Sequence, residues 1–483
     1  MTLAGPTAAP PRAGVTAREV APGDWVTAVA SGLAAGHAFA GLHALGGPAG
    51  PGVRLAMVRG AEHLLLTARA PGRRVASVAP VLPAAVWDER EAHDLHGWAF
   101  TGHEPMRPLA DHGVPTAAWT PEVDGRDVHQ MAVGPVHAGI IESGHFRFQV
   151  VGERILHVDL RLFYKHRGLE AAAEGLGHEQ ALAHVQRACA ADAVANTVAY
   201  AQACEAALGL WPTPGLRRER TLLLELERLY NHLHDLSAVC AGVGFAPGAM
   251  LFGALKERAQ RLNARLCGHR FLFGTIAVGR SGLAAGPMTG DELRGGLVDL
   301  AREVARAWHE LQFAGSLQDR LEGTGLTAAA DVLRLGAVGP AARAAGVAAD
   351  ARTAAPRLAY DGFAPAVPEA PTGDVAARVQ VRAAELTATL GRLDTLLAQP
   401  PAGPAAAGRE GDAGGLGAAT VESPRGATTC VVELAGDAVA RVHLRTGSYA
   451  NWPLLALAVR GELLADFPLI NKSFELCYAC VDR

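Results

Sequence analysis

Long stretches of helical hydrophobic periodicity constrain the second part of this 483-residue chain most strongly. Apolar residues recur every three to four positions over about residues 177–209, 216–241, 248–269, 290–319 and 375–398. A helix with one apolar stripe has to bury that stripe against another element. We therefore expect residues 129–483 to form a mainly α-helical domain, with small β elements where alternating segments occur near its two ends.

The region before residue 129 has a different pattern. A helical stretch, "DWVTAVASGLAAGHAFAGLHAL", precedes the alternating segments "VRLAMVRG" and "EHLLLTARA", which are typical of strands. We expect an α+β domain over residues 21–112 after a disordered lead at 1–20. Clusters of Pro, Gly and small residues predict a linker at 113–128 and a flexible segment at 399–420.

The charge balance argues against a nucleic-acid partner. There are 44 basic and 48 acidic residues, a formal net charge of −4, so the chain has no electrostatic footprint for nucleic acid. The N-terminus has no basic segment followed by an apolar run, and no apolar stretch approaches the length of a membrane span. We expect a cytoplasmic protein that does not itself cross a membrane.

Two short motifs carry the candidate chemistry. Cys189 and Asp192 form a C-x-x-D pair, and Cys477 and Cys480 form a C-x-x-C pair in the last seven positions. On a helix the first pair would share one face, and a folded-back tail would bring the second pair to it. Three thiolates and one carboxylate suit zinc, iron or nickel. The C-x-x-C pair alone also fits a redox disulfide, and Cys189 alone also fits a buried apolar residue.

Several stretches together resemble one family over nearly the whole chain. In order they are "GPVHAGIIESGHFRF", "VQRACAADAVANTVAYAQACE", "VGPAARAAGVAADAR", "VESPRG" and "CYACVDR". They are similar to the signature stretches of the catalytic large subunit of complex I-related [NiFe] hydrogenases. The upstream "WDEREAHDLHGWAFTGHEPMRPL" resembles the 30-kDa component of NADH:quinone oxidoreductase. This order resembles the fused large subunit of formate hydrogenlyase and hydrogenase-4 complexes.

The resemblance implies a nickel–iron centre and assigns its ligands. Cys189 and Cys477 correspond to the terminal nickel ligands, and Cys480 corresponds to one bridging ligand. Asp192 stands where the family has its second bridging cysteine. A carboxylate is a harder and weaker donor than a thiolate. This departure implies that the centre is either altered or absent.

Other positions match supporting residues of the superfamily. Arg425 corresponds to the arginine that lies over the open metal site, and Glu142 corresponds to the proton-gate glutamate. His137 matches the histidine that holds a quinone in complex I, but Ala190 replaces the tyrosine that holds it from the other side. The retained cysteines also differ from the quinone-reducing branch.

The implied function is H₂ ⇌ 2H⁺ + 2e⁻ in an arm attached to the inner face of a membrane. The chain has no iron–sulfur cluster motif, so electrons are expected to pass to a small [4Fe–4S] subunit next to other arm and membrane subunits. We expect residues 87–109 and the cleft edges around His137 to contact those partners. The alternatives are a metal-free, quinone-related subunit and a non-catalytic scaffold.

Overall fold

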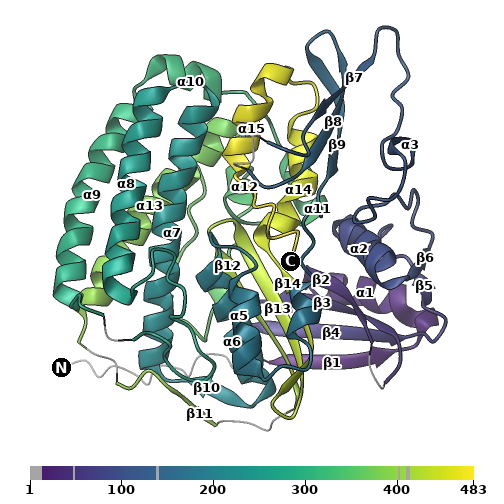
Figure 1. Ribbon diagram of the computed structural model, residues 1–483, viewed down its shortest axis with the longest axis horizontal. Helices are drawn as coiled ribbons and strands as arrows, with labels where there is room; N and C mark the ends of the chain where they lie inside the picture. The colour runs from purple at the N-terminus through teal and green to yellow at the C-terminus, as the bar shows by residue number, and fades with distance from the viewer. Residues whose placement is uncertain (1–13, 47–48, 138–140, 285, 401–402, 410–413) are drawn as a thin grey trace.

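The computed structural model describes residues 14–46, 49–137, 141–284, 286–400, 403–409 and 414–483. A bundle of long helices, a central three-stranded sheet and the N-terminal domain lie side by side in that order (Figure 1). The predicted architecture is therefore confirmed: an α+β domain is followed by a mainly helical domain with small β elements. No helix in these ranges has both the length and the apolar character needed to cross a bilayer.

The N-terminal domain is built on a four-stranded sheet in the order β1-β4-β3-β2, in which only β1 runs parallel to its neighbour. The four strands are β1 (Val15–Val20), β2 (Ala38–Leu45), β3 (Gly52–Arg59) and β4 (Glu62–Arg69). The domain also contains the separate pair β5 (Arg74–Ala76) and β6 (Ala99–Thr101), and the helices α1 (Trp25–Ala34) and α2 (Val86–His96). Trp25, Val53 and Leu55 are fully buried in its core.

The disordered lead predicted for residues 1–20 is wrong from Val15 onward, because β1 pairs with β4 from Val15 to Val20. Residues 1–13 lie outside the described ranges. The four inner residues of β1, Thr16 to Glu19, are all exposed. An edge strand of this kind has no alternating apolar face, so the period-2 pattern that reveals a strand is missing.

Four long helices form the bundle, and their apolar stripes face one another as predicted. They are α7 (Pro214–Gly242), α8 (Ala246–Cys267), α9 (Gly290–Gln312) and α13 (Val375–Ala398). The start of α9 is fixed by a capping box, in which the Thr289 hydroxyl accepts from the Glu292 amide and the Glu292 carboxylate accepts from the Thr289 amide. The predicted helix over 290–319 is interrupted after Gln312 and resumes as a separate short helix. The other helices are α3 (Thr116–Trp119), α4 (Leu169–Ala173), α5 (His178–Gln186), α6 (Ala193–Ala207), α10 (Gly315–Leu321), α11 (Ala329–Leu335), α12 (Gly339–Ala344), α14 (Gly447–Ala458) and α15 (Phe467–Phe474).

The central sheet is antiparallel, in the order β12-β13-β14. Its strands are β12 (Leu416–Ser423), β13 (Gly426–Ala435) and β14 (Ala438–Arg445), and the remaining strands are β7 (His129–Val133), β8 (His145–Val151) and β9 (Arg154–Arg161) in a meander, with β10 (Leu210–Pro212) paired to β11 (Ala407–Arg409).

The flexible segment predicted over 399–420 is therefore wrong in part, because it contains β11 and the first half of β12. Residues 401–402 and 410–413 lie outside the described ranges. Gly417 explains the misleading composition. A Cβ on Gly417 would lie 1.9 Å from the Ala203 carbonyl oxygen of α6. The close packing of β12 on α6 thus requires the small residues that resemble a linker in the sequence.

Helix α2 faces the interior of the chain. Asp88 accepts hydrogen bonds from the Leu42 amide and from Arg445 Nε of β14, each at 3.0 Å. Much of the stretch 87–109, where we expected a partner subunit, is therefore covered by this chain itself. The buried residues of this stretch are Trp87, Asp88, Glu89, Ala92, Trp98, Phe100, His103 and Leu109. For these side chains the predicted partner contact is wrong.

Candidate functional site

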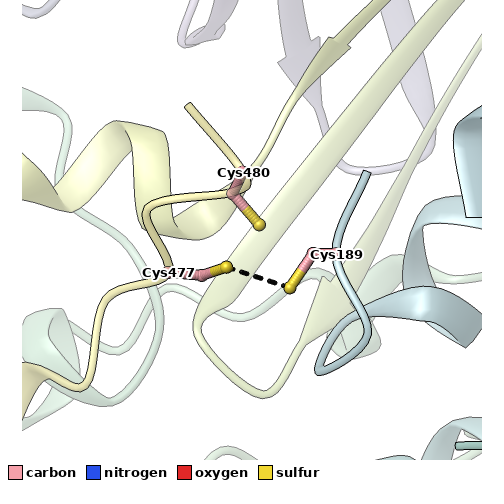
Figure 2. Close-up of side chains that lie close together, drawn as sticks. All are labelled: Cys189, Cys477 and Cys480. Carbon is pink, nitrogen blue, oxygen red and sulfur yellow. Dashed lines mark hydrogen bonds between the residues drawn. The ribbon is translucent and has the colours of Figure 1, made fainter. Parts of the chain in front are cut away.

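Three cysteines from two distant segments of the chain meet in the interior, next to the central sheet (Figure 2). Cys189 Sγ lies 3.1 Å from Cys477 Sγ, and the sulfurs of Cys189, Cys477 and Cys480 all lie within 4.8 Å of one another. Cys189 and Cys480 are buried, and Cys477 is partly buried. The prediction that the tail folds back onto Cys189 is confirmed.

Asp192 completes the group, although the backbone around it differs from the prediction. Cys480 Sγ donates to Asp192 Oδ2 at 3.5 Å, and Asp192 Oδ1 is buried without a hydrogen-bond partner among the described residues. The helix predicted over 177–209 is broken at 187–192, so Cys189 and Asp192 lie in a turn rather than on one helical face.

Side chains of α7 explain how this turn is held. The Glu227 carboxylate accepts from the Val194 and Ala195 amides at 2.6 and 3.0 Å, and so caps the start of α6. Asn231 Nδ2 donates to the Ala191 carbonyl at 2.7 Å. Asp192 occupies the N-cap position, yet its side chain makes no capping bond. Because Glu227 does the capping, the Asp192 carboxylate is left to face Cys480.

Arg167, which no sequence motif indicated, ties the two cysteine-bearing segments together. Its Nη2 donates to the Ala188 carbonyl at 2.7 Å and to the Ala479 carbonyl at 2.9 Å. Its backbone amide donates to the Asp482 carbonyl at 2.9 Å. Neither hydrophobic periodicity nor spacing marks this arginine, since its partners are backbone groups more than 300 positions away or in the turn before Cys189.

The buried thiols share their protons unequally. A hydrogen bond to Cys477 raises the pKa of Cys189 to about 12, and the hydrogen bonds that Cys477 receives from Cys189 and Cys480 lower its own pKa to about 5. Burial, followed by the nearby Cys189, raises the pKa of Asp192 to about 7. A site of this kind holds protons that a bound cation would displace.

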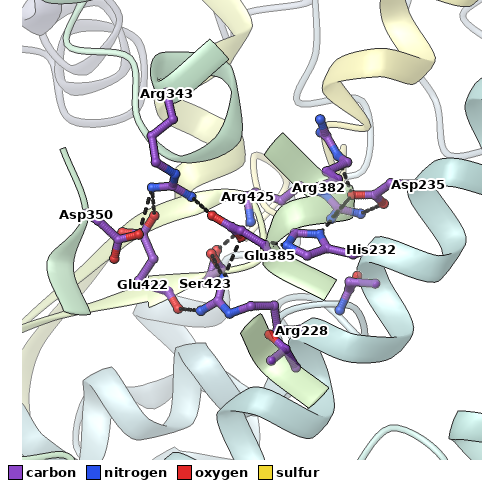
Figure 3. A network of polar contacts seen from close by, with 12 residues as sticks. Arg228, His232, Asp235, Arg343, Asp350, Arg382, Glu385, Glu422, Ser423 and Arg425 are labelled. Atoms are coloured by element: carbon purple, nitrogen blue, oxygen red, sulfur yellow. Dashed lines mark hydrogen bonds and ion pairs between the residues drawn. The ribbon is translucent and has the colours of Figure 1, made fainter. Parts of the chain in front are cut away.

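Arg425 lies at the turn between β12 and β13 and is held rigidly. Its Nη1 lies 3.0 Å from Asp235 Oδ2, its Nη2 lies 3.0 Å from Asp235 Oδ1, and its Nε donates to the Glu475 carbonyl at 2.5 Å. Asp235 also accepts from Arg382 Nε at 2.8 Å. Arg425 is thereby joined to a buried network of arginines and carboxylates, which Figure 3 shows. The guanidinium interacts electrostatically with Asp192, so a fixed positive charge adjoins the cysteine site.

Glu142 precedes β8 and is partly buried. Burial, followed by the adjacent Cys189, raises the pKa of its carboxyl group, while a hydrogen bond involving the Ala479 backbone opposes this shift. Glu142 therefore lies beside both cysteine-bearing segments and has access to solvent.

His137 is also close to the tail, but its polar edge contacts its own loop. Its Nε2 lies 2.7 Å from the Gly144 carbonyl oxygen, and its ring centroid lies 6.4 Å from that of Tyr478. Ala190, at the place of the quinone-binding tyrosine, offers no side-chain hydroxyl. Residues 138–140 of the same motif lie outside the described ranges.

Comparison with known families and proteins agrees with this architecture. The family model of the respiratory-chain NADH dehydrogenase 49 Kd subunit matches residues 243–413 and 408–483, and that of the 30 Kd subunit matches 53–119. Formate hydrogenlyase subunit 5 of Escherichia coli is 32% identical over 84% of this chain and 76% of its own length. Hydrogenase-4 component G of the same organism is 31% identical over 86% of this chain and 77% of its own length.

A solved structure extends the comparison to three dimensions. A chain of an archaeal membrane-bound sulfane sulfur reductase superposes with a TM-score of 0.66 and 27% identity, and the match covers 74% of this chain and 99% of that chain. The order of the two family matches is the order of the two structural domains. The chain therefore belongs to the oxidoreductase family of large subunits from group 4, complex I-related hydrogenases, in the form that fuses a 30-kDa-like region to a 49-kDa-like region.

Proposed function

We propose that this chain interconverts H₂ with protons and electrons at the site formed by Cys189, Cys477, Cys480 and Asp192. The observation that supports the proposal best is the meeting of three cysteine sulfurs within 4.8 Å, two of them from buried residues and one from the partly buried Cys477, in a chain of this family. Three thiols at this separation can bind one soft metal ion or share a pair of ions.

The donor set fits a metal centre on physical grounds. Soft thiolates suit nickel and iron, and the unpartnered Asp192 Oδ1 is a buried oxygen that a cation would satisfy. Cys189, Cys477, Cys480 and Asp192 would hold the metal group. When bound, a nickel–iron centre supplies the open coordination position and the redox change that hydrogen activation needs.

The side chains around this centre have separable tasks. Arg425 is held by Asp235 and does not give up its proton, so it contributes a fixed positive charge rather than acid–base chemistry. Glu142 has a raised pKa and partial solvent access, so it can take a proton from the cysteine site and release it to water.

The electrons need a route out of the chain. Seven cysteines, three of them in the candidate centre, leave no closely spaced set of four for an iron–sulfur cluster. We therefore assign electron transfer to a small [4Fe–4S] subunit, and attachment to the inner face of a membrane to further subunits. The exposed apolar residues Val136, which precedes His137, and Ile141, which pairs with His137 in an isolated β-bridge, are candidate contacts.

A second candidate is reduction of sulfane sulfur, the activity for which the similar solved structure is named. The observation that favours it is the 3.1 Å separation of Cys189 Sγ and Cys477 Sγ, with the pKa of Cys477 lowered to about 5. The Cys477 thiolate would attack the sulfur–sulfur bond of the substrate, forming a mixed disulfide and releasing the other part of the substrate as a thiolate or hydrosulfide. The Cys189 thiol would then give up its proton and displace the substrate sulfur from Cys477 as a thiolate or hydrosulfide, which closes the Cys189–Cys477 disulfide. That closure delivers two electrons to the substrate, and the partner subunit would then reduce the disulfide.

Metal analysis of the complex purified from its native source separates the candidates. Hydrogen chemistry requires nickel and iron in amounts stoichiometric with this chain, together with hydrogen-dependent reduction of a dye. A complex that lacks nickel but oxidises its electron donor when polysulfide is added supports the second candidate. A complex without nickel that reduces only quinone, or reduces nothing, supports the quinone-related or the scaffold alternative.

A further inference from the structure

A buried ion cluster connects the N-terminal domain to the segment that carries Cys477 and Cys480. Arg483 Nη2 lies 2.9 Å from Glu91 Oε1 of α2, and Arg483 Nε lies 2.8 Å from Glu170 Oε1. The Arg483 side chain is 3% exposed and that of Glu91 is 14% exposed. One arginine near the cysteine pair is thus shared between carboxylates of two domains.

An aromatic contact reinforces this link. The Arg483 guanidinium lies over the Tyr449 ring, 4.9 Å from its centroid, and Trp87 packs edge-on against the same ring at 5.8 Å. Trp87 and Glu91 are four residues apart on α2 and therefore project from the same face. Tyr449 is thereby contacted by Trp87 of the N-terminal domain and by Arg483 of the tail.

The contact is close to the thiols in both sequence and space. Arg483 follows Cys480 by three positions, and every residue from Tyr478 to Arg483 is buried. The tail after α15 has no helix or strand of its own, so it is held by contacts to its backbone, such as those from Arg167, and by contacts of its side chains, such as those of Arg483. If Glu91 were neutral, the buried guanidinium would keep only one carboxylate, and the local opening of the tail would cost less free energy.

We propose that Glu91 is a positioning residue for the cysteine site, through which the N-terminal domain holds the tail that carries Cys477 and Cys480. The domain thus helps to close the site from a different part of the fold, in addition to any partner that it binds. The consequence for metal binding rests on the proposed function, whereas the positioning itself is measurable in protein without metal.

The test is the rate at which iodoacetamide alkylates Cys480 in reduced, metal-free, full-length protein, followed by mass spectrometry. We expect Glu91→Gln to increase this rate about tenfold, and Glu91→Asp, which keeps the charge, to restore most of the protection. Glu62→Gln is the matched control, because its partner Arg59 forms an exposed ion pair in the same domain. Alkylation of Cys204, fully buried in α6, reports global unfolding.

A Glu91→Gln protein that labels Cys480 at the wild-type rate would overturn the proposal. If Cys204 also labels quickly in this variant, the milder Arg483→Lys variant decides, since it keeps the positive charge but not the two-sided geometry. Faster labelling confined to the tail supports the proposal, and no change at Cys480 overturns it. Native complex without nickel would contradict the hydrogenase function and leave the positioning role intact.

Discussion

The cysteine site and the arginine–carboxylate network lie in the same interior, but their polar atoms are satisfied in different ways. In the network a single arginine, Arg343, contacts three carboxylates at 2.5 to 2.9 Å, those of Glu385, Glu422 and Asp350. In the cysteine site the thiols contact one another and Asp192, and Asp192 Oδ1 has no partner among the described residues.

This difference separates the network, which acts as a structural scaffold, from the cysteine site, which is a candidate metal-binding site. Buried charges are tolerated when they are paired, and the guanidinium and carboxylate groups of the network have oppositely charged partners within the chain, which fixes Arg425 in place. Single atoms of these groups, such as Arg343 Nε, still have no hydrogen-bond partner among the described residues. Asp192 forms no ion pair of this kind with a described residue, although the charge of Arg425 adjoins the site, and the proposed metal ion would supply the missing cation. Each prediction below tests one side of this comparison.

The largest effect is expected from Cys480→Ser, which removes a proposed ligand. In native complex the nickel and iron bound to this chain should fall to background, since a serine hydroxyl is a much poorer donor than a thiolate. The free energy of unfolding of the metal-free chain should change by only about 1 kcal/mol. Elemental analysis and urea denaturation measure the two effects. Cys240→Ser, at a buried thiol on α7, is the matched control and should keep its metal.

Arg343→Met should have the opposite profile. Because three buried carboxylates lose their shared cation, we expect a loss of about 3–5 kcal/mol in the free energy of unfolding. Urea denaturation of the metal-free chain checks this value. Arg302→Met, which removes an exposed partner of Asp299, should leave the urea midpoint nearly unchanged. Equal midpoints for Arg343→Met and wild type would show that the network is not a scaffold.

His63 lines a cavity together with Glu422 and Asp350 of the network. We expect it to have a smaller effect on stability, and one that depends on pH. Burial lowers the pKa of His63 to about 4 from its ordinary value of 6.5, so the folded protein holds it neutral while the unfolded chain protonates it. Stability should therefore fall as the pH drops from about 6.5 to about 4, by up to about 1.4 kcal/mol per pH unit from this group. His43 and His96, whose pKa values are also lowered, add to the slope.

His63→Gln should remove the part of this slope that His63 contributes, while keeping a side chain able to bond Thr420 Oγ1, which His63 Nε2 contacts at 2.9 Å. Thermal denaturation at pH 4.5 and pH 7 gives the comparison. A wild-type slope equal to that of the variant would mean that His63 is protonated in the folded protein.

The smallest effect is expected from Asp192→Cys. A thiolate at this position is a softer donor than the carboxylate, so metal retention in native complex should stay equal or rise modestly. Dialysis against a chelator, followed by elemental analysis, measures it. Faster metal loss than in wild type would indicate that the site uses the carboxylate specifically.

The sequence predicted the long helices well because their signal is local. The apolar stripe of α9 and its Thr289–Glu292 capping box both depend on residues only three or four positions apart. The same local rules failed for β1, an edge strand with exposed side chains, and for β12, whose small residues serve the contact with α6. In both cases the information lies in the neighbouring element rather than in the strand.

The candidate site was predicted in the same uneven way. The family motifs indicated Cys189, Asp192, Cys477 and Cys480, and the structure brings their side chains together. No pattern in the sequence indicated that Arg167 would join the two segments, since it acts on backbone carbonyls.

By itself the sequence determined which residue types are present and where the helical stripes run, because both depend on positions a few residues apart. Only the tertiary structure decided that Cys189 and Cys477, 288 positions apart, would lie with their sulfurs 3.1 Å from each other. It also decided that Asp192 would face Cys480 instead of capping α6, because Glu227 of α7 occupies the capping amides. Contacts of this kind depend on how whole elements pack, and no local periodicity encodes them.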